Sequence, residues 1–156
     1  FSELFAPVSI GVRTNAKTVR ILEEITKVSK ETVDKMHKIF NTARGTSLGW
    51  AIKTITPVLR GWRNYYRLDD RKKYWEEMDE RIRHHLRKLI WIAWKKPKTR
   101  ERNLVKLGID PERAWKSSVN GRGAWWNSGQ SHMNQAIKND RFVRLGLYSL
   151  RFMEIR

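Results

Sequence analysis

Cysteine is missing from this chain of 156 residues, so neither a disulfide framework nor a thiolate metal site can form. Apolar runs are short, and none approaches the roughly 18 residues that a membrane-spanning helix requires. Acidic residues are scarce, because 16 Asp and Glu stand against 33 Lys and Arg. The sequence begins at Phe1 with neither an initiator methionine nor a signal peptide, so we expect an internal piece of a longer chain.

The resulting net charge of +17 is hard to explain without an anionic partner. Charged residues are spread along the whole chain and interleaved with eight Trp, rather than gathered in one tail. A hydrophobic content of 40% is enough for the core of one domain or of two small ones. These features predict a folded basic surface that binds nucleic acid, and no membrane partner.

Apolar residues from position 15 onward recur at intervals of three and four, which predicts an all-α fold. Residues 1–14 lack this spacing and are expected to form an extended lead-in. Asn15 and Ser29 are candidate N-caps of two successive helices, and either Thr46 or Ser47 of a third.

The second half of the chain also shows helical periodicity. Pro57 should kink the third helix or divide it in two. The longest helical segment covers about residues 71–94, and Thr99 and Asp110 are candidate N-caps of the next two helices. Two short helices should follow a Gly- and Ser-rich loop at 120–129. The apolar stripe of the longest helix is expected to be Tyr74, Met78, Ile82, His85, Leu89 and Ile92. Its other side is expected to carry Glu76, Glu80, Arg83, Arg87 and Trp94.

Candidate catalytic groups have simpler interpretations. Residues 66–70, Tyr-Arg-Leu-Asp-Asp, are similar to the Tyr-x-Asp-Asp signature of reverse transcriptase palms, but the spacing is one residue too long. The aspartates lie between two helical patterns, which favours helix capping over metal binding. His84 and His85 diverge by about 100° around a helix and cannot share an ion, and His85 reads as a core histidine. With no phosphate loop or zinc motif, we predict no catalytic residue, no metal ligand and no cofactor.

Cations are concentrated in the tract 83–106, where Glu101 is the sole acid. Local pairing cannot neutralise this tract, so it predicts contacts with phosphates. Over residues 71–83, ion pairs along a solvated helix face are an equally good interpretation. Trp91 and Trp94 either stack on unpaired bases or belong to the core.

Two further segments combine cations with aromatic residues. Arg122 lies in the glycine-punctuated loop beside Trp125 and Trp126, whose indoles are either packed or exposed. The segment 60–67 places aromatic residues on an apolar stripe, with the arginines expected on the outside. These arginines are Arg60, Arg63 and Arg67.

The segment Leu59-Arg-Gly-Trp-Arg-Asn-Tyr-Tyr-Arg-Leu68 resembles the signature of the group II intron maturase-specific domain, or domain X. The resemblance covers roughly residues 45–150, and the ordered series of motifs is more specific than any one of them. The motifs that follow in the family's order are Asp79-Glu-Arg-Ile-Arg83, Trp91-Ile-Ala-Trp-Lys-Lys-Pro-Lys-Thr-Arg100, Asn103-Leu-Val-Lys-Leu-Gly-Ile109, Gly123-Ala-Trp-Trp126, Asn134-Gln-Ala-Ile137 and Gly146-Leu-Tyr-Ser-Leu150.

This resemblance implies a thumb helical bundle followed by a helical maturase domain, both from an intron-encoded reverse transcriptase. Residues 1–14 would be a linker from an upstream palm, 15–68 the thumb-like bundle, and 69–156 the maturase-specific RNA-binding domain. In this family these parts grip the intron RNA, and the RNA itself performs the splicing chemistry. The RNA contacts expected from motif position and helix geometry are Arg60, Arg63, Arg67, Arg83, Arg87, Lys88, Lys95, Lys96, Lys98, Arg100, Arg102, Lys106 and Arg122. The signature aromatics Trp62, Tyr65 and Tyr66 are assigned to packing.

The partner that the resemblance implies is group II intron RNA, whose splicing and mobility the protein would promote in a bacterial cytoplasm or an organelle. The alternative is the thumb of an active reverse transcriptase that clamps a template–primer duplex, with target DNA as a further partner. General DNA binding is disfavoured, because no helix-turn-helix or zinc-finger pattern occurs. The chain has no palm aspartates and no endonuclease module, so neither polymerase nor nuclease activity is assigned to it.

Overall fold

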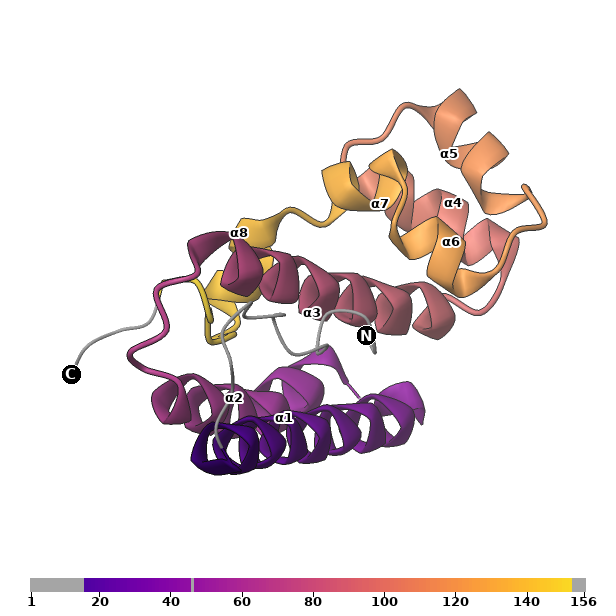
Figure 1. Cartoon of the computed structure of the whole chain (residues 1–156). Coiled ribbons are helices and arrows are strands. Elements are labelled where there is room, and N and C mark those ends of the chain that lie inside the picture. The colour runs from indigo at the N-terminus through magenta and orange to yellow at the C-terminus, as the bar shows by residue number, and fades with distance from the viewer. Residues whose placement is uncertain (1–15, 46, 153–156) are drawn as a thin grey trace.

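The computed structural model of the chain describes residues 16–45 and 47–152, with side chains from residue 27 onward except that of Val28. These residues form eight α-helices and a short 3₁₀ helix, and no strand, which confirms the all-α prediction (Figure 1). No described helix is long and apolar enough to cross a membrane. The elements are α1 (Ala16–Thr42), η2 (Ala43–Gly45), α2 (Leu48–Tyr65), α3 (Lys72–Ala93), α4 (Pro97–Lys106), α5 (Pro111–Ser118), α6 (Ala124–Ser128), α7 (Ser131–Ala136) and α8 (Asn139–Arg144).

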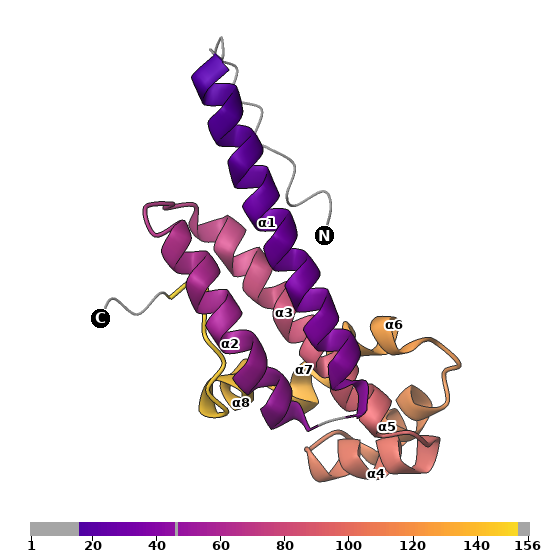
Figure 2. The same cartoon turned by 90° about the horizontal axis from the view of Figure 1, so that it is seen from below.

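Helix α1 is continuous where the sequence predicted two helices. Ser29 does not act as an N-cap, because it lies in the middle of α1. The residue is buried, and its hydroxyl lies 3.1 Å from the Tyr66 hydroxyl. Val33, Met36 and Phe40 form one buried face. Figure 2 shows the first turns of α1 reaching past the ends of α2 and α3. The lead-in at residues 1–14, Asn15 and Thr46 lie outside the described residues, as do the side chains of residues 16–26.

Helix α2 begins where its cap predicts. The Ser47 hydroxyl accepts a hydrogen bond from the Trp50 backbone N–H at 3.2 Å, which satisfies one of the free donors of the first turn. Pro57 lies inside the helix without dividing it. The buried face of α2 recurs at helical spacing and comprises Ala51, Ile52, Ile55, Leu59, Trp62 and Arg63.

Helices α1, α2 and α3 pack together into the main core. The indoles of Trp62 and Trp75 meet edge to face at 5.3 Å, and both are buried. The buried arc of α3 is wider than the predicted stripe, because η2, α2 and α6 all contact this helix. Tyr74 and Leu89 therefore lie at the edges of that arc. Its buried residues are Trp75, Met78, Asp79, Ile82, Leu86, Arg87 and Trp91.

Helices α4 to α7 form a second group at the carboxyl end of α3 (Figure 1). The Asp110 side chain accepts from the Arg113 backbone N–H at 3.3 Å and caps α5, as predicted. The predicted cap of α4 is wrong: the helix starts earlier, at Pro97, whose fixed φ and missing N–H suit a first turn, so Thr99 lies inside it. The loop predicted at 120–129 contains the short helix α6.

The chain returns to α3 after α8. The buried carboxylate of Asp79 accepts hydrogen bonds from the Leu150 N–H at 2.8 Å, the Arg151 N–H at 3.0 Å and the Ser149 hydroxyl at 2.8 Å. Three donors compensate the carboxylate for its loss of water. This contact fixes the last described residues against the main core.

Candidate nucleic-acid interface

The exposed cations of the predicted tract lie where α3 gives way to α4. Lys95, Lys96 and Lys98 flank Pro97 at this junction, and Arg102 and Lys106 follow along α4 at intervals of four residues. We call these five cations the junction surface. Among the described residues the ion pairs are Arg71–Asp69 and Lys116–Glu112, so none neutralises the junction surface. Its charge is available to an external anion.

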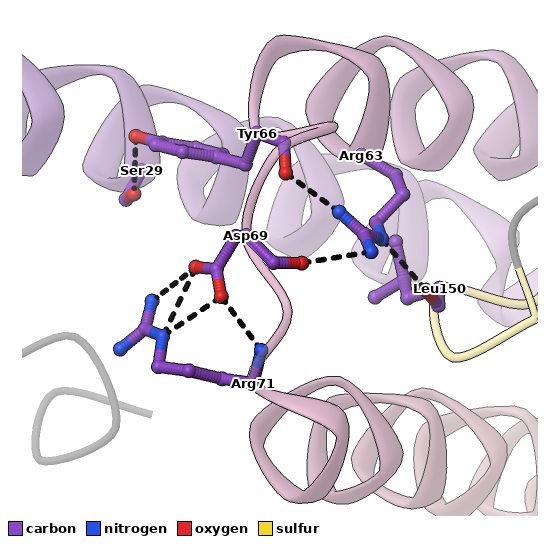
Figure 3. Close-up of polar contacts among 6 residues, drawn as sticks. All are labelled: Ser29, Arg63, Tyr66, Asp69, Arg71 and Leu150. Carbon is purple, nitrogen blue, oxygen red and sulfur yellow. Dashed lines mark hydrogen bonds and ion pairs between the residues drawn. The ribbon is translucent and has the colours of Figure 1, made fainter.

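Arg63 is not on the outside, which corrects the prediction that it contacts RNA. Its guanidinium donates to the carbonyl oxygens of Leu150 at 2.9 Å, Tyr66 at 2.6 Å and Asp69 at 3.1 Å (Figure 3). It also lies 4.6 Å from the ring centre of Trp75. Only 7% of the residue is exposed. Arg63 therefore holds the turn after α2 and the C-terminal segment together.

The aspartate pair beside this arginine does not cap α3 as predicted. The Asp69 carboxylate accepts from the backbone N–H of Arg71 at 3.0 Å and from its guanidinium at 2.6 Å (Figure 3). The hydrogen bond from the Arg71 guanidinium lowers the pKa of Asp69. Arg71 itself occupies the N-cap position, and its side chain makes no capping hydrogen bond to the first turn of α3. No group of three or more His, Cys, Asp or Glu among the described residues could hold a metal ion.

Arg87 is the second correction, because it is buried and 4% exposed rather than on the outer face of α3. Its Nη2 donates to the carbonyl of Ile137 and to Oδ1 of Asn139, both at 2.8 Å, and its Nε donates to the same carbonyl at 3.0 Å. Burial lowers the pKa of Arg87 to about 10, so the group remains charged at neutral pH. Arg87 ties α3 to the segment between α7 and α8.

Arg100 is half-buried against Trp91. Its Nε donates to the Trp91 carbonyl at 3.3 Å, and its guanidinium lies 4.6 Å from the Trp91 ring centre. Burial lowers the pKa of Arg100. Because Trp91 itself is only 2% exposed, it belongs to the core and cannot stack on a base. Trp94 is half-buried.

The remaining predicted contacts differ in exposure. Arg60 is exposed and lies 5.4 Å from the ring centre of Tyr148, while Arg67 is exposed on the turn after α2. Arg83 and Lys88 are half-buried on α3. These four residues remain predicted RNA contacts. The assignment of Tyr65 to packing is wrong, since 54% of this residue is exposed.

The loop around α6 contributes a second basic and aromatic site. Arg122 is exposed, with its guanidinium 4.9 Å from the ring centre of Trp126. Trp125 stacks on His84 at 3.5 Å, and its carbonyl is hydrogen-bonded to Nε2 of His84 at 2.8 Å. A Cβ at Gly129 would lie 3.0 Å from the His84 ring, so glycine permits this approach. Trp125 and Trp126 each keep about two fifths of their surface exposed, at 40% and 39%.

The histidine pair behaves as two separate side chains. His85 is half-buried and stacks on Phe40 at 4.7 Å, and burial lowers its pKa to about 3. The pKa of His84 is also lowered by burial. The interpretation of His85 as a packed histidine agrees with this geometry.

Sequence reasoning missed one cluster of cations, on α8. Lys138, Arg141 and Arg144 recur every three residues and are all exposed, and Asp140 is the acid among them. The spacing places them along one side of this short helix. The three-residue spacing of these cations is visible in the sequence. A helix of six residues is too short, however, to show the apolar periodicity that predicts a helix.

A comparison with known families supports the resemblance seen in the sequence. The family described as "Group II intron, maturase-specific domain" matches residues 29–108, which is 80 of the 156 residues. The match begins within α1, spans the predicted boundary at residues 68 and 69, and ends after α4. It therefore includes the junction surface. No curated protein matches the chain. The chain belongs to the family of proteins that contain the group II intron maturase-specific domain.

Proposed function

We propose that this chain binds the folded RNA of a group II intron and favours its splicing-competent structure. The observation that carries the proposal is the junction surface, whose five cations are exposed and unpaired among the described residues. This surface lies within the segment that matches the maturase-specific domain. Cations on a rigid helix junction can neutralise several phosphates at once and release their counterions.

Aromatic groups near the cations favour RNA over a purely electrostatic partner. The half-exposed indoles of Trp125 and Trp126 lie beside Arg122, so this loop combines a stacking surface with a phosphate contact. Sequence-specific RNA recognition uses unpaired bases that stack on aromatic side chains and arginine planes.

The binding experiment compares two RNAs of equal length, one a folded group II intron and one unrelated. We expect the full chain to bind the intron more tightly at every salt concentration, with log Kd depending linearly on log salt for both. Non-specific phosphate contacts contribute to the affinity for both RNAs, whereas recognition of the intron's shape contributes only to the affinity for the intron. Equal affinities throughout the salt series would reject the proposal.

The finer parts of the proposal concern the parent protein. We propose that residues 15–68 act as the thumb-like bundle and 69–156 as the RNA-binding maturase domain, and that the protein promotes splicing and mobility of its intron in a bacterial cytoplasm or an organelle. A splicing assay on intron precursor RNA, with and without the chain, tests the activity of these residues. A palm with Tyr-x-Asp-Asp upstream in the parent reading frame would add a template–primer duplex and target DNA as partners.

A further inference from the structure

An apolar hollow lies between the start of α2, the end of α3 and the end of α4. Its volume is 250 Å³, and most of its surface is hydrocarbon or aromatic. Three residues of α3 and its C-cap residue form one wall, and α2 and the residue after α4 close the sides. The apolar wall residues include Leu48, Leu89, Ile90, Ala93, Trp94 and Leu107.

A second hollow of 360 Å³ adjoins the first and is basic. Leu107 and Arg141 line both hollows, and Lys138 and Arg144 are added in the second. Asp140 is the acid on the same helix, so three cations outweigh one anion. The three cations are exposed and form no ion pair among the described residues.

Residues that line the two hollows are the sequence neighbours of the junction surface at both of its ends. Trp94 lines the apolar hollow and is followed directly by Lys95, while Leu107 lines both hollows and follows directly after Lys106. An RNA bound to the junction surface is therefore held next to residues that line the hollows.

The chemistry of the paired hollows matches one nucleotide. An apolar cavity with an aromatic wall offers a base the stacking surface that it loses on leaving a helix. The basic hollow beside it offers contacts for the flanking phosphates. Ligand pockets usually have volumes of about 300–1,000 Å³, so the two hollows together hold a single nucleotide rather than a duplex.

We propose that the apolar hollow takes up one unpaired base of the bound RNA, and that Lys138, Arg141 and Arg144 contact its flanking phosphates. This inference rests on the proposed function, because that function brings the RNA to the junction surface. It adds a contact to a base beside the junction surface, whose cations otherwise contact only phosphates.

The test uses the full chain and a single-stranded RNA of about 12 nucleotides, a size typical of single-strand sites. A second strand of the same length is fully abasic, so it keeps the phosphates and lacks the bases. We expect the chain to bind the base-containing strand on the order of ten-fold or more tightly, since stacking on one aromatic group has about that effect.

The variant Ala93→Phe fills the apolar hollow from an exposed position at the end of α3. It should lower the preference for the base-containing strand by about ten-fold and leave affinity for the abasic strand unchanged. The double variant Arg141→Gln and Arg144→Gln should weaken binding of both strands. Asn64→Phe, exposed on α2, and the pair Lys72→Gln and Lys73→Gln, exposed at the start of α3, are the matched controls.

Ultraviolet crosslinking gives a second readout that does not depend on how Ala93→Phe folds. Mass spectrometry of the wild-type complex should find the base-containing strand attached to the peptide that includes Trp94. An unchanged base preference in a folded Ala93→Phe variant, or crosslinks confined to other peptides, would overturn the inference. Loss of intron binding on reversal of the junction cations, alongside those results, would leave the proposed function intact. Binding that is indifferent to every one of these changes would reject both.

Discussion

The arginines of the interior and the cations of the junction surface lie within the same family match but have opposite environments. Arg63 and Arg87 are buried at 7% and 4% exposure, and backbone carbonyls accept their hydrogen bonds. Lys95, Lys96 and Lys98 are exposed and have no ion pair among the described residues. A cation in a nucleic-acid-binding sequence is therefore not automatically a nucleic-acid contact.

The difference follows from the chemistry of the two side chains. A guanidinium offers five N–H donors in a fixed plane, so one arginine can satisfy several carbonyl oxygens that leave helix ends or turns. Arg63 does this at the turn after α2, and Arg87 does it between α7 and α8. Lysine carries a compact, strongly hydrated charge on a flexible stem, which suits an exposed phosphate contact. The interior should thus respond to mutation in stability, and the junction surface in RNA affinity.

The largest expected effect is on the interior. Trp62→Ala should lower the free energy of unfolding by about 3–5 kcal/mol, because a buried indole leaves a cavity. Tyr65→Ala, three residues along the same motif and 54% exposed, should change it by no more than about 0.5 kcal/mol. Urea unfolding measures both. Similar losses in the two variants would contradict the distinction between the faces of α2.

The second-largest expected effect distinguishes an arginine that stabilises the fold from one that contacts RNA. Arg63→Met should cost about 2–3 kcal/mol of unfolding free energy, because buried carbonyl oxygens lose their donor. Affinity of the folded fraction for intron RNA should not change. Arg67→Met removes an exposed charge from the same motif and should leave stability within about 0.5 kcal/mol. If Arg63→Met kept full stability and lost RNA affinity, its assignment to the interior would be wrong.

Much of the helical framework could be predicted from the sequence, because caps and periodicity are local. Ser47 and Asp110 cap their helices as expected, and the helix at 71–94 occurs as α3. Burial of the arginines could not be predicted in the same way. The partner of Arg63 at Leu150 lies 87 residues away, and the partner of Arg87 at Ile137 lies 50 residues away. No local pattern indicates where a returning chain will place its carbonyl groups.

Only part of the candidate site could be predicted from the sequence, because composition is a local property and burial is not. A stretch with one acid among many cations predicts an exposed surface wherever it folds, so the junction surface followed from composition. The register of α3 did not follow, because periodicity assumes one buried face and this helix contacts neighbours on several sides. Trp75, Leu86 and Trp91 therefore replace Tyr74 and Leu89 at its centre.

The third-largest expected effect is on RNA affinity, and it comes from changing the junction surface while the core stays intact. Reversal of Lys95, Lys96 and Lys98 to Glu should weaken intron RNA binding by roughly ten- to hundred-fold and reduce the salt slope by about 2–3. The thermal midpoint should stay nearly constant, because these side chains are exposed and glutamate is favourable near the N-terminus of α4.

The control for charge alone reverses three exposed lysines elsewhere. These are Lys35, Lys38 and Lys53, on α1 and α2. They should weaken RNA binding less than the junction variant at equal net charge. A large fall of the thermal midpoint in the junction variant would show that its lysines support the fold. Equal loss of binding in both triple variants would assign the effect to net charge rather than to the junction surface.

The smallest expected effect is a change of stability with pH, which should arise in the interior and leave RNA binding by the junction surface unchanged. Burial lowers the pKa of His85 to about 3 and that of His132 to about 4, and the charges near them, including His37 and Arg113, act in the same direction. A lowered pKa means that the folded state prefers the neutral imidazole, so this stability is complete above about pH 6.5 and falls as the pH drops below it. After allowance for partial exposure, we expect a loss of roughly 1–2 kcal/mol between about pH 7 and about pH 5.

The junction surface contains no histidine, so the salt slope of RNA binding should be the same at about pH 7 and about pH 6. His85→Phe, which can keep the stack on Phe40, should reduce the pH dependence of urea unfolding to the part that His132 contributes, while Lys95 and its neighbours bind as before. Stability that stayed constant down to about pH 5 would contradict the burial of these imidazoles. A salt slope that changed with the histidines would mean that the interior and the junction surface are not independent.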